Sequence, residues 1–391
     1  MVAGTLLVIA LHLARSRLGA PVGVDFRAVW GAGRALLAGR PLYQVPEFVY
    51  PPFAALVFVP LATLKIADAA NIYSVIQVAL PLVASVILGV SLSPRHRWLV
   101  ASVCAVLLMK ADVFVDSLFL YNPSLLFVLP LVAIVFYWLR SQWTTGAVLL
   151  GFTLAVKPLL LLLIMVPLLR RDWRSAGCAA GSATLLTLGM LPFTHDLPGL
   201  AALPGRILHG TDLHGLAQVL NVSLGSVGIV HPGWNAAVAV LRVFLTGAVG
   251  WLLWRTRNTV LSPVDMTVVA GALALTLPVV GSLSEIHYCV LALPACAALL
   301  SGRLGTPARI LGGVAFLVLC FPLFNLHLNN VSGEVLQLRW AFGSALTLLA
   351  CCLARFTPPH STPAAGEVAA PLKEGEQAHR LKAATPVPAD L

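Results

Sequence analysis

The run Ile72–Leu92, IYSVIQVALPLVASVILGVSL, decides the fold, because it contains no charged residue over its 21 positions. A helix rises about 1.5 Å per residue, so a helix of this length crosses a hydrocarbon core of about 30 Å. Two further runs, Ala176–Phe193 and Val264–Gly281, are nearly as long and almost free of charge. Several such runs in one chain predict an all-α polytopic membrane protein.

The composition agrees with these runs. Of the 391 residues, 59% are hydrophobic and 10% are charged, which leaves too little polar surface to cover a soluble globule. The net charge of +10 is spread over short segments between the apolar runs. Such spreading orients membrane helices and differs from the clustered patch that binds nucleic acid. We therefore expect a lipid bilayer as a partner and no nucleic acid.

The basic segments also predict which side each loop faces. Short loops rich in Lys and Arg stay in the cytoplasm, which applies to Pro94–Arg97, Arg170–Arg174, Arg255–Arg257 and Arg303–Arg309. Residues 15–52 and 194–235 then form periplasmic loops of a plasma-membrane protein. Arg15 and Arg17 argue against an outer first loop, but long loops obey the rule weakly. Residues 357–391, rich in Pro, Ala, Glu and Lys, are predicted to be a disordered cytoplasmic tail.

The segment Thr144–Leu169 breaks the simple pattern of crossings. Basic residues flank it on both sides, and Lys157 and Pro158 lie at its centre. Two half-helices of about 12 residues, each rising about 18 Å, would enter from the cytoplasm, turn at the lysine and return. The alternative is one long tilted helix with a proline kink. In both cases an intramembrane lysine is a candidate for function, with a phosphate as its natural partner.

A polar loop, Val24–Pro52 (VDFRAVWGAGRALLAGRPLYQVPEFVYPP), carries aromatic residues and one early acid, Asp25, before Glu47. A carboxylate at a membrane face can act as a general base. Asp25 can equally be the N-cap of a helix that begins near Arg27, because Asp is favoured there. The residues alone leave both interpretations open.

Six segments resemble glycosyltransferase family 87, and they occur in the family's order. They are DFRAVWGAGRALLAGRPLY, FVYPPFAALVFVPLATL, TGAVLLGFTLAVKPLLLLLIMVPLLRRDWRSA, NVSLGSVG, SEIHY and QLRWAFGSALTLLACCLARF, and together they span most of residues 1–356. The resemblance implies a GT-C fold over residues 1–356, a bundle of about 11–13 transmembrane or half-membrane helices with its active site at the outer face.

The resemblance also implies an activity. A sugar would pass with inversion from a polyprenyl-phosphate donor to a polysaccharide or lipoglycan acceptor, without a cofactor. Within the family, the detail is most similar to the actinobacterial members that add α-(1→3)-arabinofuranosyl branches from decaprenyl-phosphoryl-arabinofuranose. The alternative is a polyprenyl-phosphomannose-dependent α-mannosyltransferase of lipoglycan synthesis. A lipid or sugar transporter or flippase is a second alternative, although transporters commonly contain an internal repeat and none is visible here.

Some site residues carry over one by one from this resemblance, whereas Lys157 and Arg206 are candidates because their charge suits a phosphate. Asp25 stands at the position of the family's base, and Asn122 stands where many members carry glutamine in a Gly-Gln-x-Asn signature. The other expected contacts with donor phosphate or substrate are Lys157, His287, Glu285, Tyr50, Asn221 and Arg206. Local structure offers alternatives: Asn221 suits a turn, and Glu285 with His287 suits a solvated helix cap.

Four histidines in the later loop invite a metal site: His195, His209, His214 and His231. The five-residue step from His209 to His214 is not a helical i,i+4 pair, and carboxylates are few nearby. We therefore expect no metal ion, and a loop that rests on the outer interface and shapes the acceptor groove.

Overall fold

A computed structural model describes residues 22–110, 120–209, 232–281, 286–300, 304–320 and 333–354, with the single positions 7, 10, 14, 18, 114, 117, 118, 223 and 224. Residues 1–356 form one compact unit. All regular secondary structure in the described residues is helical, which confirms the all-α prediction. The predicted tail, residues 357–391, lies outside the described residues.

Four of the described helices are long and apolar enough to cross a membrane. They are α4 (Ile66–Leu92), α10 with its short extension α11 (Trp173–Thr194), α15 (Asn235–Thr256) and α16 (Pro263–Val280). The three apolar runs of the sequence fall on α4, α10–α11 and α16. Within the most apolar window, 83% of α16 is buried but only 17% of α10–α11. Helix α16 is therefore the centre of the bundle, while the apolar outer faces of α10 and α15 are suited to lipid.

The remaining helices pack around these in pairs. Their bounds are α2 Val24–Leu37, α3 Pro52–Ala62, α5 Arg97–Lys110, α7 Val128–Leu139, α8 Trp143–Val156, α9 Met165–Leu169, α12 Leu197–His209, α17 Ala292–Leu300, α18 Thr306–Cys320 and α19 Gly333–Leu353. The short 3₁₀ helices that matter for the site are η1 Leu42–Gln44, η3 Pro123–Phe127, η4 Pro158–Ile164 and η6 Ile286–Leu291. The most extensive pairings are α8 with α10, α4 with α5, α18 with α19 and α2 with α3.

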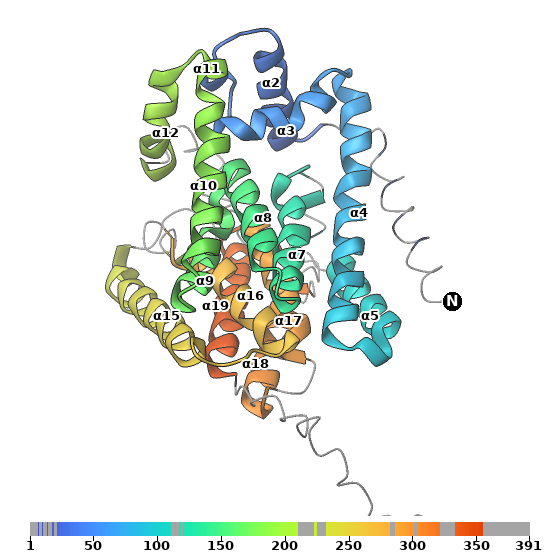
Figure 1. Cartoon of the computed structure of the whole chain (residues 1–391), viewed down its shortest axis with the longest axis vertical. Helices are drawn as coiled ribbons and strands as arrows, with labels where there is room; N and C mark the ends of the chain where they lie inside the picture. The colour runs from blue at the N-terminus through green and yellow to red at the C-terminus, as the bar shows by residue number, and fades with distance from the viewer. Residues whose placement is uncertain are drawn as a thin grey trace, which may run out of the picture. The chain divides into compact units, whose positions relative to one another are not determined.

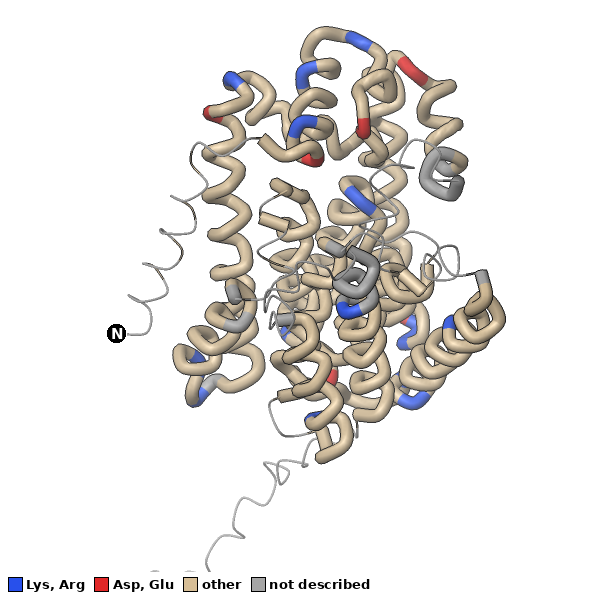
Figure 2. Tube along the Cα trace, turned by 180° about the vertical axis from the view of Figure 1, so that it is seen from behind, with Lys and Arg blue, Asp and Glu red and all other residues tan. Residues whose placement is uncertain are grey.

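One end of the unit gathers the polar loops. Figure 1 shows α2, α3, α11 and α12 together at this end, above the long helices. Charged residues gather there and at the far ends of the helices, with few in between (Figure 2). This distribution is the one expected when the middle of a bundle faces hydrocarbon.

The segment around Lys157 is a hairpin. Helix α8 ends at Val156, Lys157 is extended (φ −158°, ψ 126°), and η4 and α9 return. The guanidinium of Arg170, just after α9, lies 5.1 Å from the centroid of the Trp143 ring, at the start of α8. Both ends of the segment therefore meet on one side. A single kinked helix, the alternative from the sequence, would hold them far apart.

Small residues let the hairpin lie close to α10. Ala147, Gly151 and Ala155 recur every four residues along α8, and the two alanines are fully buried. A Cβ at Gly151 would overlap the Ser182 hydroxyl of α10. Such four-residue spacing of small residues brings helix backbones together in membranes. The packing fixes α8, and with it the height of Lys157.

Candidate active site

Asp25 lies in the first turn of α2, and its carboxylate is held by Asn122. The Nδ2 group of Asn122 donates a hydrogen bond to Oδ2 of Asp25 at 2.8 Å. Helix α2 begins at Val24, its N-cap is Gly23, and no side chain caps it. The interpretation of Asp25 as the N-cap of a helix beginning near Arg27 is therefore wrong, because the helix starts three residues earlier.

A close backbone approach brings these two residues together across 97 positions of sequence. Gly23 lies against the carbonyl of Leu120, and a Cβ at residue 23 would overlap that oxygen. Tyr121 follows with a left-handed backbone (φ 54°) and a buried ring. A bulky residue in this conformation costs about 1–3 kcal/mol, and such strain persists where the surrounding structure imposes it. The turn at Leu120–Tyr121 thus presents Asn122 to the start of α2.

Asn122 has little freedom to turn away. It is fully buried, and its side-chain Oδ1 accepts a hydrogen bond from the backbone N–H of Ser124 at 2.8 Å. Its backbone N–H donates to the Ser117 carbonyl at 2.9 Å. Gln77 of α4 donates from Nε2 to the Asn122 carbonyl at 2.8 Å. Because Oδ1 caps η3, the NH₂ group must face Asp25. The donor is preorganised for a negatively charged carboxylate.

Aromatic rings pack next to the pair formed by Asp25 and Asn122. Phe26, next to Asp25, stacks on Tyr73 with ring centroids 4.7 Å apart and lies 6.2 Å from the Tyr121 ring. Phe58 packs against both Phe26 and Tyr73. These rings place apolar surface beside Asp25, and apolar surroundings strengthen electrostatic interactions at a carboxylate.

Lys157 lies against two tyrosine rings at the tip of the hairpin. Its Nζ is 4.7 Å from the centroid of Tyr50 and 4.5 Å from that of Tyr288. Tyr50 is buried, while Lys157 and Tyr288 are partly exposed. Cation–π contacts of this kind contribute about 0.5–2 kcal/mol each and orient the ammonium group. The arrangement holds a partly exposed cation between two aromatic rings.

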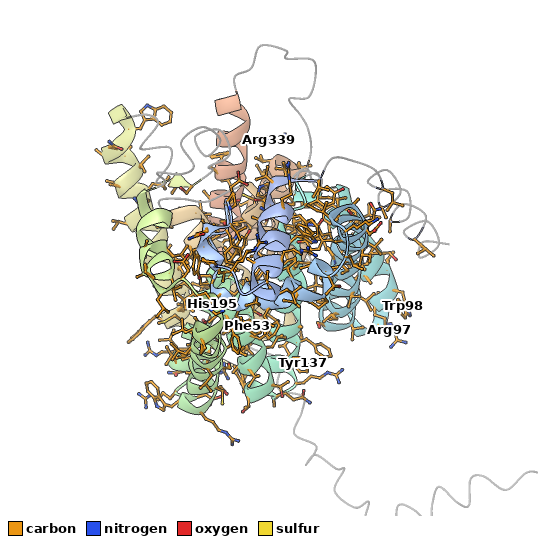
Figure 3. All side chains as sticks on the ribbon, turned by 90° about the horizontal axis from the view of Figure 1, so that it is seen from above. Phe53, Arg97, Trp98, Tyr137, His195 and Arg339 are labelled. Carbon is orange, nitrogen blue, oxygen red and sulfur yellow. The ribbon has the colours of Figure 1, made fainter. Side chains whose placement is uncertain are left out.

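The first loop is tied to this cation. The hydroxyl of Tyr43 in η1 donates to the Tyr50 carbonyl at 3.2 Å. Burial, and then the nearby Asp196 carboxylate, raise the pKa of the Tyr43 phenol, so it stays a donor. Asp196 itself accepts from the Gly199 amide at 2.9 Å at the start of α12. Next along the chain, Phe53, which is labelled in Figure 3, packs edge-on against Phe152 of α8, with centroids 5.3 Å apart.

The structure thus brings Asp25 to Asn122 and Lys157 to Tyr50. His287 lies in η6 beside Tyr288 and is 1% exposed, so the alternative of a solvated helix cap is wrong for its side chain. Asn221 and Glu285 lie outside the described residues, and the structure describes Arg206 only by its backbone in α12. Their roles stay predictions.

Two neighbours of the site were not singled out from the sequence. Tyr288 belongs to the SEIHY segment, but nothing in that segment shows that its ring meets Lys157. Gln77 gave a signal, because an amide in an apolar run is costly unless it is bonded. Among the described residues, no group of three or more His, Cys, Asp or Glu side chains comes together to hold a metal ion.

Comparison with known proteins bears on the whole arrangement. Residues 48–279 match the model of glycosyltransferase family 87. Two relatives are an α-(1→3)-arabinofuranosyltransferase of Mycobacterium tuberculosis, in two strains, each 27% identical over 69% of this chain. Another, from the same organism, is a polyprenol-phosphate-mannose-dependent α-(1-2)-phosphatidylinositol mannoside mannosyltransferase, 29% identical over 72% of this chain and 69% of its own length.

The match to the arabinofuranosyltransferases spans 64% of their length. The family model alone covers more than half of the present chain, from the end of the first loop through α16. The chain belongs to glycosyltransferase family 87.

Proposed function

We propose that the protein is a multi-pass membrane glycosyltransferase that moves a sugar from a polyprenyl-phosphate donor to a cell-envelope glycan, with inversion. Family 87 is a family of GT-C membrane glycosyltransferases. The observation that carries the proposal is the Asp25 carboxylate, oriented at 2.8 Å by a buried amide. A positioned carboxylate is what an acceptor hydroxyl requires when it loses its proton.

In this mechanism the acceptor oxygen attacks the anomeric carbon while its proton passes to Asp25. The bond from the anomeric carbon to the donor phosphate oxygen breaks, and its electron pair leaves with the lipid phosphate. One displacement with one base inverts the anomeric centre, in contrast to the retaining scheme with its covalent intermediate. Lys157 meets the charge that grows on the leaving phosphate and stabilises the transition state more than the ground state.

For the sugar we propose arabinofuranose, carried by decaprenyl phosphate and added as an α-(1→3) branch. The arabinofuranosyltransferase relatives support this choice. Mannose from a polyprenyl-phosphomannose is the second candidate. It is supported by the mannosyltransferase relative. Family membership weighs against a transporter or flippase.

The test is turnover by the purified protein in detergent or nanodiscs. Each polyprenyl-phospho-sugar is incubated with short arabinan and mannan acceptors, and the product linkage is analysed. We expect transfer from the arabinofuranosyl donor with an α-(1→3) linkage. Transfer from the mannosyl donor alone would reassign the sugar, and movement of the lipid without glycoside formation would favour the flippase.

The tyrosine at the hairpin tip gives a separate prediction. Tyr288→Leu removes one of the two aromatic rings against the Lys157 ammonium group. The donor KM should therefore rise by about 3–30-fold, the range of one cation–π contact. Tyr288→Phe keeps the ring and should stay near wild type. Tyr137→Leu on α7, also a partly buried tyrosine (Figure 3), is the matched control and should not change donor KM. Equal losses in Tyr288→Leu and Tyr288→Phe would assign the effect to the hydroxyl instead.

We propose that the loop end of the unit faces the outside of the cell. In a background without native cysteines, Gln44→Cys and Asn258→Cys place single thiols at exposed positions in η1 and between α15 and α16. An impermeant thiol reagent added to intact cells should label residue 44 and leave residue 258 unlabelled until the cells are opened. The reverse pattern would put Asp25 on the cytoplasmic side and exclude the proposed acceptor.

A further inference from the structure

Gln77 is a buried amide in an apolar helix, a place where a polar side chain lowers the stability of the fold. It lies in the apolar helix α4 and is fully buried. Its Nε2 donates to the Asn122 carbonyl at 2.8 Å, but its Oε1 has no partner among the described residues. A half-satisfied buried amide stabilises a helix less than an apolar side chain of the same size does. Stability alone therefore does not explain a glutamine here.

Two further buried hydroxyls belong to residues that neighbour Gln77 or Asn122 along the chain. Tyr73 lies one helical turn earlier on α4, within electrostatic range of Asp25, and Ser124 follows Asn122 by two residues. Both hydroxyls are buried and without a partner among the residues that the structure describes. Surplus buried polar atoms of this kind call for an explanation and are typical of functional sites.

A chain of two hydrogen bonds connects Gln77 to the base. Gln77 fixes the backbone of Asn122, and the side chain of Asn122 donates to Asp25. The chain joins α4, η3 and α2, which are far apart in sequence. Without the first bond, the strained turn at Tyr121 would lose one of the interactions that hold Asn122 in line.

We propose that Gln77 is a positioning residue of the transfer reaction, which acts through Asn122 to orient and to keep ionised the carboxylate of Asp25. The proposal rests on the proposed function of Asp25 as the base. A hydrogen bond donated to an ionised carboxylate favours the ionised form. Loss of its alignment makes the carboxylate easier to protonate, and a protonated base is inactive. Positioning should therefore appear in the pH dependence of transfer.

The experiment compares pH profiles of kcat/KM. Gln77→Met keeps the length of the side chain but removes both polar atoms. We expect the acid limb of its profile to move to higher pH by about 0.5–1 unit. Ser85→Ala is the matched control, because it also removes a buried polar group from α4, and its limb should not move. Tyr73, the titratable group of α4 within electrostatic range of Asp25, is unchanged in both variants.

Two results would overturn the proposal. One is a Gln77→Met enzyme whose rate falls equally at every pH, which indicates a purely structural role. The other is full additivity with Asn122→Ala, because a residue that acts through Asn122 has little effect once that amide is gone. If Gln77→Met does not fold, Gln77→Asn retains the amide on a shorter arm and is held to the same two criteria. If the wild-type protein transfers no sugar, the proposed function is refuted. If the wild type is active but the acid limb of the Gln77→Met profile does not move, only the positioning role of Gln77 is refuted.

Discussion

Asp25→Asn should lower the rate of sugar transfer by about 10²–10⁴-fold, the usual contribution of a positioned general base. The amide has the shape of the carboxylate, and its oxygen can still accept from Nδ2 of Asn122. The fold and donor binding should therefore survive, while the proton of the acceptor hydroxyl has no place to go. Single-turnover transfer and donor binding, measured on the same purified sample, separate the two effects.

Asp68→Asn is the matched control for this substitution. Asp68 also lies in the first turn of a helix, α4, but it is exposed. If Asp25 served only the helix dipole, both variants would lose about 0.3–1 kcal/mol of stability and neither would lose transfer. Near wild-type turnover in Asp25→Asn would remove Asp25 as the base. It would leave the Asn122 bond as a structural contact.

Lys157→Met should lower transfer by about 10²–10³-fold, as loss of one preorganised group on a developing negative charge does. Methionine fits between apolar neighbours and is accommodated by aromatic rings. It should therefore fold well and also bind the donor more weakly. Lys157→Arg keeps a cation against Tyr50 and Tyr288 and should restore part of both quantities. Donor binding and transfer for both variants give the measurement.

A purely packing role for Lys157 predicts the opposite order, because methionine suits a buried tip and the bulkier arginine does not. Lys65→Met provides the matched control at an exposed lysine before α4 and should leave transfer unchanged. Unchanged donor affinity in Lys157→Met would end the phosphate role, whatever happens to the rate.

The helices of the bundle could be predicted because a membrane crossing needs only length and composition. The runs that became α4, α10–α11 and α16 satisfy both without any tertiary information. The hairpin could be predicted as well, since basic residues at both of its ends require the same side. The alternative kinked helix fitted the proline equally well, and only the contact of Arg170 with Trp143 excludes it.

The pairing of Asp25 with Asn122 could not be predicted. It depends on the missing side chain of Gly23 and on a left-handed residue at Tyr121. Glycine adopts that conformation without strain. Tyrosine rarely does, so no local pattern in the sequence indicates the turn that presents Asn122. The wrong N-cap at Asp25 has a similar cause, because Gly23 ends the loop without a capping side chain.

The hairpin also constrains how the protein is made. An ammonium group such as that of Lys157 is costly against lipid, so the tip is stable only when protein surrounds it. One of its main neighbours is α16, which η4 contacts and which emerges from the ribosome about a hundred residues later. Until α16 has been inserted, η4 can pack only against earlier helices such as α8 and α10. The site at its tip is completed by the docking of a late helix, so a chain truncated before α16 would place Lys157 in the membrane without one of the helices that enclose the tip.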